Sequence, residues 1–214
     1  MPSPFALASI VTGLFVVGLV VAERKDHAPA RALTKTLASV GFCAAGVSAL
    51  PAATSFGRLM LAGLVLSLVG DVLLLSEKKA PFLAGMGAFA AAHVAYVAAF
   101  VVRGVAPFAT EGALVLSVPA IAIVLGWLLP KAPSDMRGPV IGYAIVISAM
   151  VAAAVGTTVL HGGASITLGA LMFYASDLSV ARDRFVAPGF VNRAWGLPLY
   201  YAAQLVLAAS SPGA

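Results

Sequence analysis

The chain has 214 residues, of which 61% are hydrophobic and only 10% charged, and its mean hydropathy is +1.03. Soluble globular domains carry about 45–50% apolar and about 25% charged residues, so this composition excludes that class and predicts an all-α bundle of membrane-spanning helices. The formal net charge is +5, but the cations lie between apolar runs and form no basic domain, which argues against nucleic acid as a partner.

Eight apolar runs follow one another along the chain. They cover residues 5–22, 36–53, 59–75, 82–102, 112–129, 140–160, 164–181 and 190–209. Each run approaches the roughly 20 residues that a helix needs to cross the hydrocarbon core. No Lys or Arg precedes the first run, which is atypical of a signal peptide, so we interpret it as the first span. The breaks are short and rich in Pro and Gly, which predicts one transmembrane domain of eight helices over residues 1–214.

The distribution of Lys and Arg among the seven breaks predicts the topology. The odd-numbered breaks and the residues beside them hold 11 of the 13 cations, and the even-numbered breaks hold only Arg58 and Arg103. The positive-inside rule then places the odd breaks in the cytoplasm and both termini on the other side. We therefore expect a multi-pass protein of the cell membrane with both termini extracytoplasmic.

Two aspartates, Asp71 and Asp177, lie inside the third and seventh predicted spans, where a carboxylate is costly. Each is four residues from the cytoplasmic end of its span, about 6 Å along a helix, so both are expected at one depth. Two carboxyl groups that meet cannot both ionise easily, which leaves an acid beside a base. The alternative is structural: each aspartate hydrogen-bonds a neighbouring helix, or Asp71 reaches the membrane interface, without any chemistry.

Polar pairs on two further spans are candidates to complete such a site. His93 and Tyr96 are three residues apart on the fourth span, and Tyr200 and Gln204 are four apart on the eighth, so each pair shares a helix face. Taken alone, His93 is equally well explained as a hydrogen-bonded interior histidine.

Four polar residues are expected at the cytoplasmic rim of the bundle: Lys35, Arg184, Asn192 and Arg193. The cations among them fit ordinary positive-inside anchoring, and the functional alternative is that these residues bind a phosphate headgroup.

Several chemistries have no support. The chain lacks a glycine-rich phosphate loop, an H-E-x-x-H helix motif and a G-x-S-x-G elbow. His27 and His161 fall in loops far from His93, and Cys43 is the only cysteine, so neither a metal site nor an internal disulfide is expected. An intramembrane aspartyl protease is a partial likeness only: its Gly-x-Gly-Asp motif needs glycine where this chain has Leu68, and its Tyr-Asp is here Ser176-Asp177.

The chain resembles the YhhN-type lysoplasmalogenase family of eight-span membrane proteins over most of its length. The resemblance is carried, in order, by LTK at 33–35, LSLVGDVLL at 66–74, FAAAHVAY at 89–96, GALMFYASD at 169–177, Arg184-Phe185 and YYAAQ at 200–204. One departure is that the usual Lys-Pro-Leu-Thr before the second span is here Leu33-Thr34-Lys35-Thr36.

The resemblance implies hydrolysis of the vinyl ether bond of a lysophospholipid substrate, a lysoplasmalogen, with release of a fatty aldehyde and glycerophosphoethanolamine or glycerophosphocholine. It makes Asp71 and Asp177 the expected catalytic pair, without metal or cofactor. His93, Tyr96, Tyr200 and Gln204 are then expected to orient water or the glycerol hydroxyl, and Lys35 with Arg184 to hold the phosphate. Ser67, Tyr174, Ser176 and Asn192 complete the expected substrate-binding set.

Two other classes of function remain open at this stage. In a proton-coupled transporter of small molecules or lipids the same aspartates relay protons. Transporter folds usually contain internal repeats, and the two four-span halves show no convincing similarity. In a purely structural membrane scaffold, both aspartates tolerate replacement by asparagine without loss of any activity.

Overall fold

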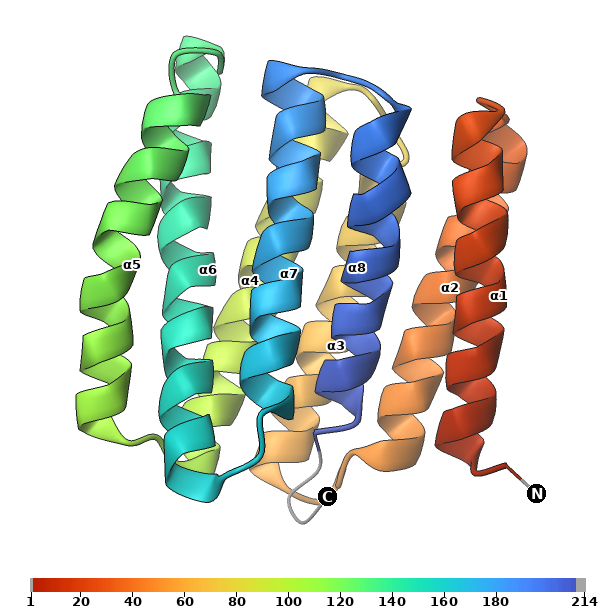
Figure 1. Ribbon diagram of the computed structural model, residues 1–214. Helices are drawn as coiled ribbons and strands as arrows, with labels where there is room; N and C mark the ends of the chain where they lie inside the picture. Colours follow the sequence, from red (N-terminus) through yellow and green to blue (C-terminus); the bar gives the residue numbers. More distant parts are fainter. Residues whose placement is uncertain (1, 211–214) are drawn as a thin grey trace.

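The computed structural model describes residues 2–210, which form eight α-helices and one short π-helical segment, with no strand in that range (Figure 1). The elements are α1 (Pro4–Arg24), α2 (Ala28–Ala49), α3 (Ser55–Leu73), α4 (Lys79–Arg103), α5 (Pro107–Leu128), α6 (Ser134–His161), α7 (Ser165–Ala181), η1 (Arg182–Val186) and α8 (Phe190–Ala208). The predicted all-α class is confirmed. Successive helices run up and down, so α1 begins and α8 ends at the same end of the bundle (Figure 1).

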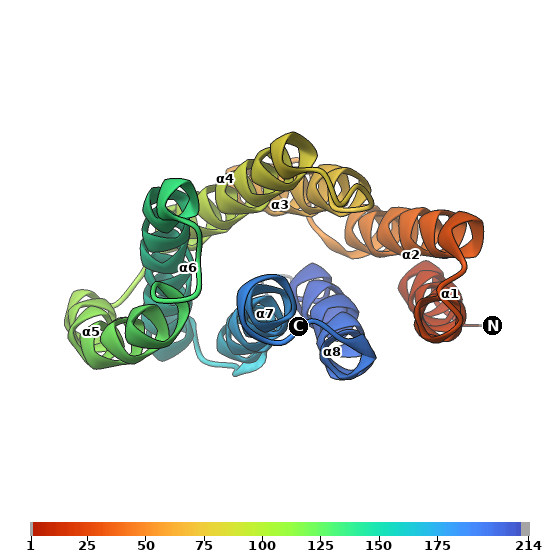
Figure 2. The ribbon, with the colours of Figure 1, turned by 90° about the horizontal axis from the view of Figure 1, so that it is seen from above.

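Six of the helices form a curved row, and the other two lie on its concave side. Seen from above, the row runs α1, α2, α3, α4, α6, α5, and α7 and α8 sit inside the curve (Figure 2). The packing agrees, because α8 contacts α1, α2, α3 and α7, while α7 contacts α6. The side chains of α7 and α8 are therefore placed to meet those of the row in the interior.

Helices α1 to α6 are long and apolar enough to cross a membrane. Helix α7, with 17 residues, and the more polar α8 are not in that group. Helix α8 carries buried polar residues such as Asn192 and Gln204, as expected of polar groups within a membrane bundle. The crossing of the membrane by all eight helices stays a prediction.

Helix α2 begins eight residues before the predicted second span. The Nδ1 atom of His27 accepts a hydrogen bond of 3.1 Å from the backbone N–H of Ala30, and Pro29 occupies the first turn, which together favour a helix start there. Lys35 therefore lies inside a helix and not in a loop, which alters the role expected for it.

Two glycines let α4 approach α3 closely. A Cβ atom at Gly63 would lie 2.4 Å from the ring of Tyr96, and one at Gly70 would lie 2.7 Å from the ring of Phe89. Close packing of this kind holds membrane helices together, since lipid offers no hydrophobic drive between them. It also positions Tyr96 and Phe89 beside the segment that carries Asp71.

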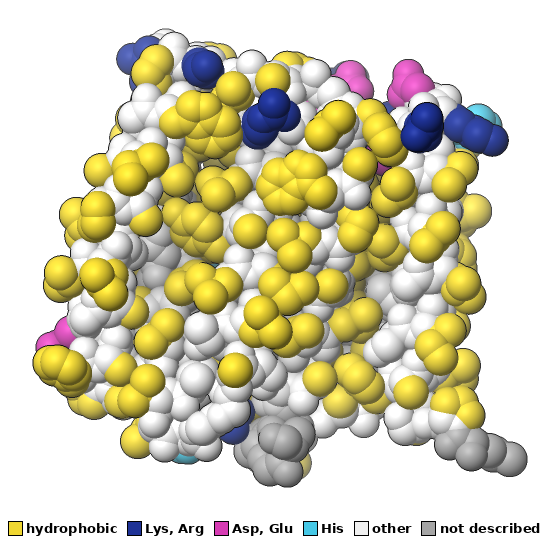
Figure 3. Space-filling model, viewed as in Figure 1, with side chains coloured by type: hydrophobic (Ala, Val, Ile, Leu, Met, Phe, Trp, Pro, Cys, Tyr) yellow, Lys and Arg dark blue, Asp and Glu magenta, His cyan; other side chains and the backbone are white. Residues whose placement is uncertain are grey.

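The outer surface is apolar, with most of its cations at one end; Arg58 and Arg103 lie at the other end. Aliphatic side chains such as Leu14 and Val115 are exposed. Hydrophobic side chains cover most of the face shown in Figure 3, and most of the Lys and Arg on that face gather along the upper edge, where α1 ends and α8 begins. Helix α5 is the most peripheral helix, since Leu128 is its only buried residue. This surface is that of an integral membrane protein.

Candidate active site

A cavity of about 460 Å³ lies between the helical row and the two inner helices, and both predicted aspartates line it. Asp71 enters from α3 and Asp177 from α7. One wall of the cavity is apolar and is formed by residues of α4, α5 and α6, such as Phe89, Leu128 and Ile147. One cavity, with an apolar wall and both carboxyl groups on its lining, is thus built from helices far apart in the chain.

Asp71 is 2% exposed and is surrounded by donors. Its Oδ2 accepts hydrogen bonds from Tyr200 Oη at 2.6 Å and from Ser39 Oγ at 2.8 Å. Its Oδ1 lies 3.4 Å from the Nζ of Lys35, whose side chain is 11% exposed. The ammonium group offsets the charge of a carboxylate that is otherwise removed from water.

The donors around Asp71 are themselves held in place. Tyr201 donates to the backbone carbonyl of Lys35 at 3.1 Å and lies 3.1 Å from Ser39 Oγ. From the other side, Gln204 Nε2 donates to Tyr200 Oη at 3.2 Å, and Gln204 Oε1 accepts from Tyr96 Oη at 2.9 Å. The resulting series from Tyr96 through Gln204 and Tyr200 ends on the Asp71 carboxylate.

Asp177 has different neighbours and no Lys or Arg partner within the described residues. Its Oδ2 lies 2.6 Å from the hydroxyl oxygen of Tyr143 and 3.4 Å from Nε2 of His93, and its side chain is 19% exposed. His93 is fully buried; its Nε2 lies 2.9 Å from the Tyr143 hydroxyl and its Nδ1 lies 3.2 Å from the sulfur of Met150.

An aromatic layer links the surroundings of the two carboxyl groups. The ring of Phe173 lies edge-on to His93, with centroids 4.7 Å apart, and to Tyr200 at 5.3 Å. Phe89 packs against both Phe173 and Tyr200. Within the described chain no hydrogen bond joins Asp71 to Asp177. They face one cavity, each with its own protein partners, and not as a hydrogen-bonded pair.

The predicted rim residues divide into two groups. Lys35 does not lie at the rim: it is buried against Asp71, because α2 starts early enough to carry it inside. Arg184 does line the cavity, with its guanidinium 4.4 Å above the ring of Phe82 and NH1 3.4 Å from the carbonyl oxygen of Glu77. No carboxylate contacts Arg184 in residues 2–210, which leaves its charge available to a ligand.

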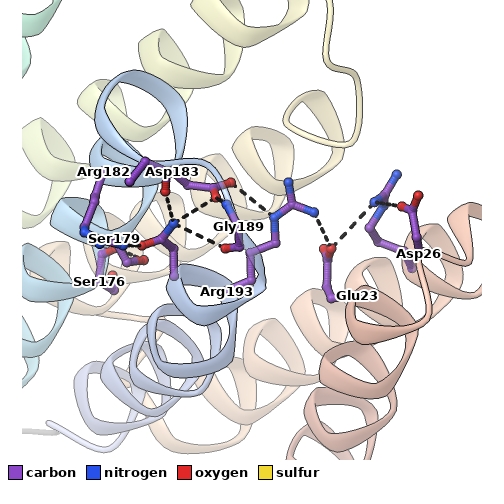
Figure 4. Close-up of polar contacts among 11 residues, drawn as sticks. Glu23, Asp26, Ser176, Ser179, Arg182, Asp183, Gly189 and Arg193 are labelled. Carbon is purple, nitrogen blue, oxygen red and sulfur yellow. Dashed lines mark hydrogen bonds and ion pairs between the residues drawn. The ribbon is translucent and has the colours of Figure 1, made fainter. Parts of the chain in front are cut away.

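Arg193, the remaining cation predicted at the rim, belongs to a row of ion pairs that connects α1 and α2 to α8 (Figure 4). The row consists of Arg31, Glu23, Arg193 and Asp183. Glu23 accepts from Arg193 at 2.8 Å and lies 3.6 Å from Arg31, and Arg193 also donates to Asp183 at 3.1 Å. Asn192 is buried below this row, where its amide donates to Asp183 Oδ1 and to the Ala187 carbonyl and accepts from Arg182. These contacts hold the turn between η1 and α8.

The remaining predicted residues lie near the site with local contacts. Tyr174 and Ser176 line the cavity, and the Ser176 hydroxyl donates to the carbonyl of Phe173 at 2.7 Å. Ser67 is buried on α3 and its hydroxyl has no hydrogen-bond partner among the described residues. Their roles in substrate binding stay predictions.

Four residues in the surroundings of Asp71 and Asp177 were not predicted from the sequence: Ser39, Tyr143, Met150 and Tyr201. Tyr143 and Met150 are seven residues apart and therefore share one face of α6, a spacing that is visible in the sequence. Ser39 lies four residues after Lys35, again on one helix face. However, the sequence of one apolar run does not indicate which other helix packs against such a face.

Comparison with known proteins gives one consistent answer. The model of the YhhN family matches residues 30–211. The chain is 36% identical over 156 residues to the human protein named lysoplasmalogenase TMEM86B, and the match covers 73% of this chain and 64% of that protein. It is 32% identical over 155 residues to bovine lysoplasmalogenase TMEM86A, covering 70% and 63%. The chain thus spans somewhat less than two thirds of these relatives. No solved structure gives a significant match. The family match covers most of the chain, and the chain belongs to the YhhN family.

Proposed function

We propose that this protein is an integral membrane hydrolase that cleaves the vinyl ether bond of lysoplasmalogens. The observation that carries the proposal is the placement of Asp71 and Asp177 on one apolar cavity in unlike surroundings. Relatives named lysoplasmalogenase support the substrate class. The two-aspartate mechanism and the products are part of the proposal.

The chemistry of the bond explains the need for two carboxyl groups. Proton transfer to the alkenyl carbon C2 forms a C–H bond and leaves an oxocarbenium ion at C1. Water adds to C1 and loses a proton to a base, which gives a hemiacetal. The hemiacetal then breaks its bond to the glycerol oxygen, which takes up a proton, and the aldehyde is released. One water is consumed, and one carboxyl must begin protonated while the other is ionised, as in glycosidases.

The surroundings of Asp71 suit the ionised role. The Lys35 ammonium and the Tyr200 and Ser39 hydroxyls all donate toward it, and each of these contacts favours the carboxylate over the acid. We assign to Asp71 the stabilisation of the cation at C1 and the activation of water. His93, Tyr96, Tyr200 and Gln204 orient these groups.

The cavity suggests how the substrate lies. The alkenyl chain is accommodated by the apolar wall of α5 and α6, which includes Val124, Leu128 and Val140. The phosphate is held by Arg184, whose guanidinium is the cavity-lining cation with no carboxylate contact in the described chain. With the cationic ends of the helices in the cytoplasm, as predicted, the headgroup enters from that side of the cell membrane.

The direct experiment is aldehyde release by the purified full-length protein in lipid vesicles. Lysoplasmalogen is expected to be cleaved, whereas the matched 1-O-alkyl lysophospholipid is not, because it lacks the alkene that accepts the proton. Asp71→Asn and Asp177→Asn are expected to lose activity by at least about a hundredfold. Wild-type rates in both variants would refute the proposal, and solute flux across the vesicles with no aldehyde would favour a transporter.

A further inference from the structure

The two ends of the curved helical row differ in how they meet the inner helices (Figure 2). At one end, α1 packs against α8, and Glu23 of α1 accepts a hydrogen bond of 2.8 Å from Arg193 of α8. At the other end, α5 packs against α6, and among the inner elements of residues 2–210 it packs on η1 and not on α7. The interior of the bundle is therefore closed at the α1 end and less enclosed between α5 and α7.

The cavity extends to this less enclosed side. Its lining includes Val124 and Leu128 of α5, four residues apart on one helix face, and Tyr174, Leu178 and Ala181 of α7, which also share a face. All of them except Leu128 are only half-buried. Because α5 and α7 line one cavity without packing on each other in the described part of the chain, these five residues border a side opening of the cavity.

The side opening faces the hydrocarbon of the membrane. Toward the cationic end of the bundle it is bounded by η1, which contacts α5, and toward the other end α6 is joined to α7 by a hydrogen bond of 2.8 Å from Thr167 to Thr158. The neighbouring outward side chains are apolar: Ile123 of α5 is 74% exposed and Leu171 of α7 is 50% exposed. An opening in such a surface admits a hydrocarbon chain and disfavours a charged group.

The cavity itself ends about one helical turn beyond the carboxyl groups. Asp71 is the deepest lining residue of α3. On α7 the lining ends at Tyr174, three residues or about 5 Å beyond Asp177. On α6 it ends at Ile147, four residues or about 6 Å beyond Tyr143, which is hydrogen-bonded to Asp177. Half of the hydrocarbon core is about 15 Å thick, so a membrane lipid chain that starts at the carboxyl groups is too long to end below them.

The mouth at the cationic end is a poor alternative route for the chain. Charged side chains line it, and they are Glu23, Arg31, Asp183, Arg184 and Arg193. A hydrocarbon chain that turned back to this mouth would expose methylene groups to charges and water, which is unfavourable. The charged mouth suits the headgroup, and the apolar side opening suits the chain.

We propose that the alkenyl chain of the substrate leaves the cavity through the side opening between α5 and α7 and ends in the bilayer. The protein then encloses the headgroup and the ether bond but not the chain end. The ligand class is a single-chain ether lipid that enters sideways from its leaflet, with no upper limit on chain length. The proposal rests on the proposed function for the position of the vinyl ether at the carboxyl groups, whereas the side opening is a feature of the fold.

A bulky group at the chain end tests this path in the wild-type protein. A lysoplasmalogen with pyrene on the last carbon of its alkenyl chain is compared in vesicles with the untagged lipid of equal chain length. Because the tag lies in the bilayer, kcat/KM is expected to stay within about threefold. A tagged lipid that is cleaved about a hundredfold more slowly would show that the protein encloses the chain end, and would overturn the proposal.

Narrowing the side opening tests its position. Val124→Trp is expected to lower kcat/KM for a chain of about sixteen carbons about tenfold more than for a chain of about six carbons, which ends within the cavity. Ile123→Trp, at the adjacent outward residue, is the matched control and should leave the ratio of the two substrates unchanged. An equal loss on both chain lengths in Val124→Trp would contradict passage between α5 and α7.

Photo-crosslinking locates the chain end without any cleavage. The probe is a 1-O-alkyl lysophospholipid of about sixteen carbons with a diazirine on its last carbon, bound to the full-length protein in vesicles. Adducts that excess untagged 1-O-alkyl lipid suppresses are expected on α5 and α7. Such adducts on α4 or α8, around the closed part of the cavity, would overturn the proposal. Adducts on α5 and α7 in a protein that releases no aldehyde from lysoplasmalogen would support the side opening and refute the proposed function alone.

Discussion

The ammonium group of Lys35 lies 3.4 Å from Oδ1 of Asp71, and both side chains are buried between α2, α3 and α8. A buried ion pair contributes little net stability when intact, but removal of one partner leaves the other charge without compensation. This relationship makes Lys35 part of the proposed reaction centre, and it leads to the first prediction.

Lys35→Met is expected to inactivate the protein and to destabilise it by about 3–5 kcal/mol, because the Asp71 carboxylate loses its counter-ion inside the bundle. Aldehyde release and thermal unfolding in detergent measure the two effects. Lys35→Met combined with Asp71→Asn should recover most of the stability and none of the activity. Unfolding of the single variant at the wild-type temperature would show that the pair is not formed.

Tyr200→Phe removes the 2.6 Å hydrogen bond to Asp71 and is expected to lower kcat by about tenfold or more, since hydrogen bonds to a charged group contribute about 1.5–3 kcal/mol. Tyr201→Phe is the matched control on the next residue. Its hydroxyl contacts Ser39 and the Lys35 carbonyl and does not contact the carboxyl group, so kcat should change less. Equal losses in the two variants would contradict a direct role for Tyr200.

Arg184→Gln is expected to raise KM about tenfold with little change in kcat, because in the proposed complex the side chain binds the phosphate away from the reacting bond. Steady-state kinetics with lysoplasmalogen measure both constants. Arg58→Gln, at the opposite end of the bundle, should leave them unchanged. A fall in kcat with an unaltered KM would place Arg184 outside the headgroup site.

Much of the fold follows from hydropathy, and much of the site does not. The eight apolar runs correspond one to one with α1–α8, since burial in lipid requires continuous apolar helices. Asp71 and Asp177 were recognisable because an ionisable residue is anomalous in such a run. The partners of the two aspartates were harder to predict. Lys35 was expected at the rim because the charged residues of 31–35 suggest a loop. The cap by His27, which starts α2 at Ala28, is difficult to recognise in the sequence.

The order of helices in space was also beyond the sequence. Helix α4 packs against α6, and α5 lies outside them, so Tyr143 reaches Asp177 from a helix that hydropathy cannot assign to any neighbour. The expectation that the two carboxyl groups meet is replaced by two carboxyl groups with separate hydrogen-bond partners on one cavity. The position of each aspartate along its helix could be inferred from the sequence. Which helices lie side by side depends on close contacts such as that of Gly70 with Phe89, which the sequence does not reveal.

Glu23→Gln is expected to lower the stability by about 1–2 kcal/mol, because Glu23 is largely buried and joins Arg193 of α8 to Arg31 of α2. Asp26→Asn is the matched control: Asp26 also contacts Arg31, but its side chain is 89% exposed, and its loss should be within about 0.5 kcal/mol. Thermal unfolding of the two variants compares them directly, and an equal effect would argue against the ion-pair row as a tie between the helices.

The most direct test of the central claim is the position of deuterium in the product formed in D₂O. Proton delivery from a carboxyl group to the alkene predicts one deuterium at C2 of the released fatty aldehyde, which is trapped at once by reduction to the alcohol. The label should appear with the wild-type protein, and Asp177→Asn should form no product above background. Release of aldehyde without deuterium at C2, or undiminished release by Asp177→Asn, would contradict the account.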